Sequence, residues 1–268
     1  GKIEWSGRSG VFRCFPSLPH PDGREMKPSF ENLKALCPDV DPRLVEEHLS
    51  RLNVRYYERF SEDDIREHLD GLSLLSSKGP VKLHIKETGH RPVDFTVLGF
   101  DYLGVFSLMT GILAGMGFNI SSGEAFTYRR RTERSGPREP HRGQTRSRRR
   151  KDALSRRRIV NHFSGSWTRE FRFKEWAAEL EKRICAVFAL LEKEDSLSAE
   201  QARHQVNEMV AKELDHFQSD PSHGLSPVLI EVDNESGEYT RLRIVSEDTP
   251  AFLYSLTQAF SLHGIAIE

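Results

Sequence analysis

The sequence has few cysteines and no long apolar run, and each scarcity excludes a class of protein. Cysteine occurs at only three of 268 positions, Cys14, Cys37 and Cys185. An odd number so widely spaced forms neither a disulfide framework nor a paired metal site, so we expect a cytoplasmic protein. The longest apolar stretch, Val105 to Phe118, contains three glycines and is too short to cross a bilayer, so we expect no membrane contact.

Clusters of metal ligands are also missing from the sequence. The eleven histidines show no ligand spacing. His48 and His68 fall in expected helices and His84 in an expected strand, where a packed or solvated side chain is commoner than a metal ligand. We therefore expect no metal site and no cofactor in this chain.

The net charge of −1 conceals a strongly basic segment. From Arg129 to Arg158 there are thirteen arginines and Lys151 against three acidic residues. The segment has too few apolar side chains to offset the conformational entropy that it would lose on ordering. We therefore predict a disordered loop over 129–158. The segment lacks interleaved aromatic residues and any folded nucleic-acid motif, so we do not expect nucleic-acid binding. A tolerated loop insertion and a contact with an acidic face of the same protein remain open.

The first 25 residues differ from the rest of the chain. They show no helical or strand period and no signal-peptide order, whereas regular patterns follow Met26. Either Met26 is the true start and a read-through or cloning remnant precedes it, or these residues are the tail of an upstream domain. We assign residues 1–40 to an irregular or non-native leader.

Helix signals between residues 41 and 79 predict a helical lead-in. Asp41-Pro42 combines an N-cap acid with proline at the first helical position, and Ser61 to Asp64 resembles a capping box. Apolar residues follow both starts at helical spacing, and Gly79-Pro80 closes the second helix. Alternating residues then predict strands over 81–85 and 93–100.

One pattern occurs twice in the chain, 147 positions apart. Residues 95–120 and 242–267 align without a gap, and each reads as strand, acidic turn, amphipathic helix, glycine stop and strand. The alignment places Asp101 opposite Asp248, Thr110 opposite Thr257, Gly117 opposite Gly264 and Ile120 opposite Ile267. A duplicated module of this kind usually senses something, and the cut end of the second copy indicates a piece of a longer protein.

The segments between the two copies complete a domain. Patterns predict strands over 119–128, 159–167 and 228–232 and helices over 173–194 and 198–217, the second of these capped from Ser198. With the first repeat they give the βαββαβ order of ferredoxin-like domains. We therefore expect an α+β fold with a complete first domain over 80–232 and the start of a second over 233–268.

Several motifs in this order resemble a known family. Asp101-Tyr-Leu-Gly104 before a helix, with Gly117-Phe-Asn-Ile120 after it, is similar to the ACT domain, a small amino-acid-sensing module. Three further stretches resemble the tandem ACT region of bacterial PII uridylyltransferases: Arg55-Tyr-Tyr-Glu-Arg-Phe with Ser61 to His68 after it, Arg158-Ile-Val-Asn-His-Phe, and the run from Val232 to Leu242. The resemblance covers about 41–268, except the basic segment and the helix over 198–217. It extends to the amino-terminal regulatory part of some glutamate-type dehydrogenases.

The resemblance implies a ligand site between the first strand–helix turn of one copy and a strand of its neighbour. The helix that starts near Leu103 would offer unpaired N–H groups to a carboxylate. Asp101 would bind an ammonium group, or alternatively cap its helix. Gly104 would keep the approach open, and Asn119 would hydrogen-bond an amide or carboxylate at the edge.

The second copy departs from the family at the same turn. Ala251 stands where the family prefers glycine, which removes freedom of φ and close backbone approach. For Asp248, helix capping is therefore the favoured role. The candidate ligand-binding residues are Asp101, Leu103, Gly104, Asn119, Asp248 and Ala251.

The function implied is regulatory binding of a glutamine-like amino acid in an enzyme of nitrogen metabolism. The segment itself has no catalytic residues, because the His-Asp dipeptide and the Gly-Ser…Asp-x-Asp arrangement of the uridylyltransferases are absent. We expect the N-terminal part of a glutamate-type NAD-dependent dehydrogenase. The alternatives are the C-terminal region of a PII uridylyltransferase and a stand-alone interaction module with an Arg-rich arm. Pairing of ACT units within one chain or in a homo-oligomer is expected.

Overall fold

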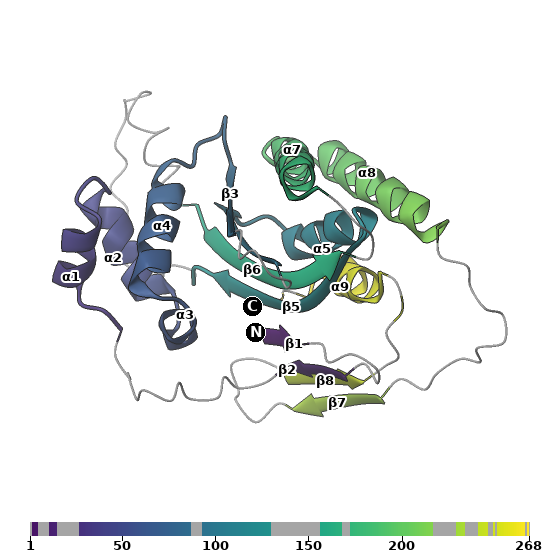
Figure 1. Cartoon of the computed structure of the whole chain (residues 1–268), viewed down its shortest axis with the longest axis horizontal. Helices are drawn as coiled ribbons and strands as arrows, with labels where there is room; N and C mark the ends of the chain where they lie inside the picture. The colour runs from purple at the N-terminus through teal and green to yellow at the C-terminus, as the bar shows by residue number, and fades with distance from the viewer. Residues whose placement is uncertain are drawn as a thin grey trace, which may run out of the picture.

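The described part of the chain is an α+β structure with helices on both faces of an antiparallel sheet (Figure 1). The computed structural model describes residues 2–4, 11–14, 27–86, 93–129, 156–167, 172–216, 229–233, 241–245, 249, 251–265 and 267. The helices are α1 (Phe30–Leu36), α2 (Pro42–Arg51), α3 (Val54–Arg59), α4 (Glu62–Ser73), α5 (Val105–Gly115), α7 (Phe173–Leu191), α8 (Ser196–Leu214) and α9 (Phe252–Leu262). The strands are β1 (Lys2–Glu4), β2 (Val11–Cys14), β3 (Val81–Lys86), β4 (Val93–Phe100), β5 (Phe118–Thr127), β6 (Arg158–Trp167), β7 (Leu229–Asp233) and β8 (Arg241–Val245).

The helical lead-in forms where its capping signals predict. The Asp41 side chain accepts a hydrogen bond from the backbone N–H of Arg43 at 2.9 Å at the start of α2. At the start of α4, Ser61 and Asp64 form a reciprocal capping box, in which each side chain accepts from the other's backbone N–H. Two orphan N–H groups are thereby satisfied, which fixes where the helix begins.

The structure differs from the sequence analysis at two local points. The leader over 1–40 contains β1, β2 and α1, although its sequence shows no regular period before Met26. Helix α8 is capped by Asp195 instead of Ser198, whose backbone N–H donates to Asp195 Oδ1 at 2.7 Å. Because the Asp195 side chain takes the N-cap position and accepts this bond, α8 begins at Ser196.

The sheet order is β3-β4-β6-β5-β1-β2-β8-β7, and every neighbouring pair is antiparallel. Strand β7 was expected to complete the first copy. It pairs instead with β8 of the second copy, while β3 occupies the edge beside β4. Only residues 234–240 separate β7 from β8, and sequential strands so joined form an antiparallel hairpin readily.

The two hairpins have the same register, which lengthens the repeat. Lys82 pairs with Leu98 in the first hairpin, and Leu229 pairs with Val245 in the second. Both members of the second pair lie 147 positions after those of the first. The repeated unit therefore begins with a hairpin, one strand earlier than the sequence pattern alone indicated.

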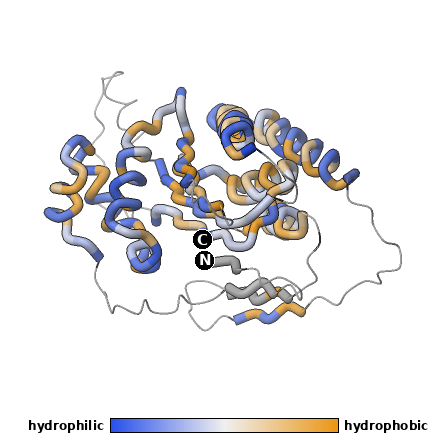
Figure 2. The backbone as a smooth tube through the Cα atoms, viewed as in Figure 1, coloured by the Kyte–Doolittle hydropathy of each residue, from blue (hydrophilic) through white to orange (hydrophobic). Residues whose placement is uncertain are grey.

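Apolar side chains fill both sides of the sheet. One core lies between the sheet and α5, α7 and α8, and includes Phe95, Ile112 and Phe188. The other lies between the sheet and α1–α4, and includes Tyr56, Leu98 and Phe126. Helix α5 is buried almost all round, and its tube in Figure 2 is mostly hydrophobic. Among the described helices, none is both long and apolar enough to span a membrane.

Candidate ligand pocket between the two copies

The two repeat helices, α5 and α9, lie against each other on the side of the sheet where α7 and α8 also lie (Figure 1). The hydroxyl oxygens of Thr110 and Thr257 are 3.1 Å apart and buried. Gly111 allows this close approach, because a Cβ there would lie 2.4 Å from Val206 of α8 and 2.6 Å from the ring of Tyr254. The absence of a side chain at Gly111 therefore lets α5 contact α8 and α9 together.

Both repeat helices begin with the same left-handed residue. Gly104 is the N-cap of α5 with φ 75°, and Ala251 is the N-cap of α9 with φ 60°. The alanine thus keeps the turn that glycine adopts in the first copy, at a cost of about 1–2 kcal/mol. Gly104 also faces α9 directly, since a Cβ there would lie 2.3 Å from the hydroxyl oxygen of Ser261.

Asp101, the expected ammonium ligand, is paired with an arginine. Its carboxylate Oδ2 lies 3.2 Å from Arg157 Nε, and its backbone N–H donates to the Arg157 carbonyl at 2.9 Å. The residue at the N-cap of α5 is Gly104, so Asp101 does not occupy the capping position. A ligand ammonium at Asp101 would have to compete with Arg157.

The other predicted site residues are dispersed. Leu103 is 77% exposed at the turn. Asn119 is exposed on β5, where it pairs with Ser166 of β6. Asp248 lies outside the described residues. Among the described candidates from the first copy, Leu103 and Gly104 lie beside α9 of the second copy.

A small pocket opens at the junction of α5, α8 and α9. Water-sized space within it amounts to about 20 Å³, which accommodates a compact polar group but not a whole amino acid. Asp101, Asn119 and Ala251 do not line it. Its walls are formed by Leu103, Gly104, Ser107, Leu108, Leu191, Ala199, Arg203, Tyr254, Gln258, Ser261 and Leu262.

The α9 side of this pocket is held by polar contacts with α8. The Tyr254 hydroxyl donates to Asn207 Oδ1 at 2.5 Å, and the Gln258 amide donates to the same oxygen at 3.1 Å. Burial raises the pKa of Tyr254 to about 12, and the nearby Arg203 opposes that rise. The sequence analysis did not identify Arg203, because α8 has no equivalent in the repeat. It did not identify Gln258 either, because the equivalent position in the first copy is Gly111, which has no side chain.

The end of the basic segment is ordered by acidic partners. Arg156 forms two 2.8 Å bonds to the Glu192 carboxylate, which also accepts from the Tyr102 hydroxyl, and Arg158 lies 3.2 Å from Glu47. With the Arg157–Asp101 pair, three successive arginines contact acidic residues of the protein itself. The predicted end of the disordered loop at Arg158 is therefore too late, because residues 156 and 157 are ordered and Arg158 already belongs to β6. Residues 130–155 lie outside the described ones.

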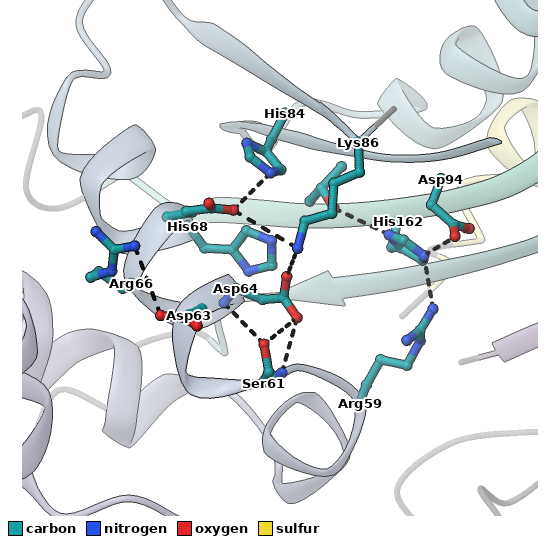
Figure 3. A network of polar contacts seen from close by, with 12 residues as sticks. Arg59, Ser61, Asp63, Asp64, Arg66, His68, His84, Lys86, Asp94 and His162 are labelled. Atoms are coloured by element: carbon teal, nitrogen blue, oxygen red, sulfur yellow. Dashed lines mark hydrogen bonds and ion pairs between the residues drawn. The ribbon is translucent and has the colours of Figure 1, made fainter. Parts of the chain in front are cut away.

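A second polar cluster joins α3 and α4 to the opposite face of the sheet (Figure 3). Lys86 pairs with Asp64, and His84 Nε2 lies 2.7 Å from Glu67. The group comprises Arg59, Ser61, Asp64, Glu67, His84, Lys86, Asp94, Thr96, Glu124 and His162, and we term it the anchor network. No set of three or more metal-ligating side chains within the described ranges could hold a metal ion.

His162 occupies the buried end of the anchor network. Its ring nitrogens lie 2.8 Å from the Arg59 guanidinium and 3.1 Å from the Thr96 hydroxyl. Arg59 also donates to the buried Glu124 carboxylate at 2.5 Å. Burial and the positive charge of Arg59 lower the pKa of His162 to about 4, so the ring is neutral near pH 7 and accepts from Arg59. The network fastens the lead-in helices to the sheet.

Comparison with known proteins identifies no family for this chain. Neither protein-family models nor curated proteins match this chain.

Proposed function

We propose that the chain is a regulatory module that binds a small amino acid, glutamine or a relative, through two ACT-like units. The observation that carries this proposal is the packing of α5 against α9. It puts equivalent residues of the two copies in contact and leaves a pocket beside the N-terminus of α5. Sites between repeated units suit regulation, because a ligand there responds to their relative packing.

The order of elements supports the ACT-like, ferredoxin-like assignment. From β4 to α7 the chain runs strand, helix, strand, strand, helix, with β6 between β4 and β5 in the sheet. The fourth strand position, beside β4, belongs to β3, which precedes the unit instead of following it. The proposed unit is therefore a permuted version of the expected βαββαβ order.

The proposed parent is a cytoplasmic enzyme of nitrogen metabolism. We favour a glutamate-type NAD-dependent dehydrogenase whose catalytic part follows this segment, with a PII uridylyltransferase as the alternative. Ligand binding that changes the packing of the two copies by about 1–3 kcal/mol would suffice to bias an attached domain. The segment itself would supply no catalytic residue and no cofactor.

Titration calorimetry of this chain against the twenty amino acids tests the proposal. We expect saturable binding of glutamine or a close relative. Ser261→Leu should abolish binding by filling the space beside Gly104, whereas Lys182→Leu, on the exposed face of α7, should leave it unchanged. Circular dichroism would verify that both variants fold. Absence of saturable binding to any amino acid at millimolar concentration would refute the proposal.

A further inference from the structure

We infer that the pocket between the two copies binds the side-chain carboxylate of an amino acid, and that Arg203 of α8 makes the ligand an acidic amino acid in preference to its amide. This inference rests on the proposed function and specifies its ligand. Helix α8 lies outside the stretches that resemble the ACT family, so Arg203 is a feature of this chain's own architecture.

The N-terminus of α5 supplies one part of the carboxylate site. The N–H groups of Val105 and Leu108 donate to the carbonyls of Tyr102 and Gly104. Those of Phe106 and Ser107 have no hydrogen-bond partner in the described part of the chain. Free N–H groups and the positive end of the helix dipole favour an anion at this position.

The Ser107 hydroxyl is an independent indication of a ligand. Ser107 lines the pocket and is only 4% exposed, yet its hydroxyl makes no hydrogen bond with any described residue. The hydroxyl is open to the pocket, where a carboxylate oxygen would accept its hydrogen bond.

Arg203 supplies the charge that selects an acid. It lines the same pocket from α8, and it forms no ion pair with the residues that the structure describes. Neighbouring arginines differ from it in this respect, since Arg156 and Arg157 are paired with Glu192 and Asp101. A guanidinium can bind a carboxylate bidentately, and charge-assisted bonds are about twice as strong as neutral ones.

The size of the pocket fits this assignment. Its roughly 20 Å³ of water-sized space admits a carboxylate group, while the rest of an amino acid would lie toward the exposed Leu103.

Glutamate and glutamine are the matched probes, because they differ only by the replacement of a carboxylate oxygen with an amide group. Calorimetry should give at least about tenfold tighter binding of glutamate to the unmodified chain. Arg203→Gln should remove that preference, and Arg203→Lys should retain part of it. Lys212→Gln on the same helix, exposed and outside the pocket, is the control for a general charge effect.

The outcomes separate this inference from the function on which it rests. If the chain binds glutamine and Arg203→Gln leaves the glutamate-to-glutamine ratio unchanged, the role of Arg203 is refuted and the sensor function stands. If the chain binds neither these two nor any other amino acid, the sensor function itself is refuted. Loss of the preference in Arg203→Gln but not in Lys212→Gln supports the inference.

Discussion

Thr110 and Thr257 occupy equivalent positions in the two copies, 147 residues apart, and their hydroxyl oxygens are 3.1 Å from each other. Contact between equivalent residues is the mark of an approximate twofold axis, as in isologous dimers. A second set of residues agrees with this relation. Gly111 of α5 faces Tyr254 of α9. The residues at the equivalent positions of the other copy, Gln258 of α9 and Ser107 of α5, both line the pocket. The copies therefore pair within the chain as the subunits of a symmetric dimer would.

The threonine contact should contribute measurably to stability. Each hydroxyl also bonds a carbonyl of its own helix, so Thr110→Val and Thr257→Val leave no wholly unsatisfied group. We expect each to lower the free energy of unfolding by about 1 kcal/mol, with a coupling of about 0.5–1 kcal/mol in the double variant. Urea denaturation of the four proteins measures this cycle, and strictly additive effects would contradict an energetic contact between α5 and α9.

The turns before α5 and α9 should respond in opposite directions to the exchange of glycine and alanine. Ala251→Gly removes the strain of a left-handed alanine and should stabilise the protein by about 1 kcal/mol, as measured by thermal denaturation. Gly104→Ala should destabilise it by more than that, because the new Cβ also meets Ser261.

Measuring the cost of Gly104→Ala both in the unmodified protein and in Ser261→Ala separates the backbone strain at residue 104 from its steric overlap with Ser261. Once the Ser261 hydroxyl is removed, the nearest remaining atom is its Cβ at 3.4 Å, so Gly104→Ala should cost little beyond the backbone strain. An equal cost in both backgrounds would show that Ser261 does not restrict this position.

How much of this structure the sequence predicts depends on the range of the interaction. Local signals located α2 and α4 through their caps, and the two aligned copies located α5 and α9. Long-range relations were not predictable. The partner of β7, the Arg157–Asp101 pair and the position of Arg203 at the pocket are each decided by packing between segments distant in sequence. The candidate site was therefore predicted at its turn and missed on α8 and α9.

Stability should fall with pH below neutrality because three buried histidines, His48, His68 and His162, have lowered pKa values. Burial lowers the pKa of His68 to about 3, and burial with Arg59 lowers that of His162 to about 4, against 6.5 for an ordinary histidine. Below pH 6.5 the unfolded chain takes up protons that the folded chain does not, so the free energy of unfolding decreases as pH falls. The decrease should reach about 2 kcal/mol per histidine at pH 5, and it ends below the folded pKa values.

Chemical denaturation between pH 7.5 and pH 5 measures this dependence. His162→Gln should flatten the pH profile, because the replacement does not titrate. His204→Gln, at an exposed position on α8, should leave the profile unchanged. A profile for His162→Gln that matches the unmodified protein would contradict a neutral, buried His162.

The Arg156–Glu192 pair should stabilise the fold more than the surface ion pairs do. It is bidentate, its side chains are 21% and 17% exposed, and the guanidinium lies 3.9 Å from the centre of the Phe100 ring. Arg156→Met removes the cationic partner of Glu192, leaves it bonds from neutral hydroxyls such as that of Tyr102, and should cost about 1–3 kcal/mol in unfolding free energy. The matched control is Arg172→Met, whose pair with Glu175 has side chains 85% and 72% exposed and should contribute less than about 1 kcal/mol. Equal losses in the two variants, measured by urea denaturation, would mean that Arg156 does not fasten the end of α7 to the turn before α5.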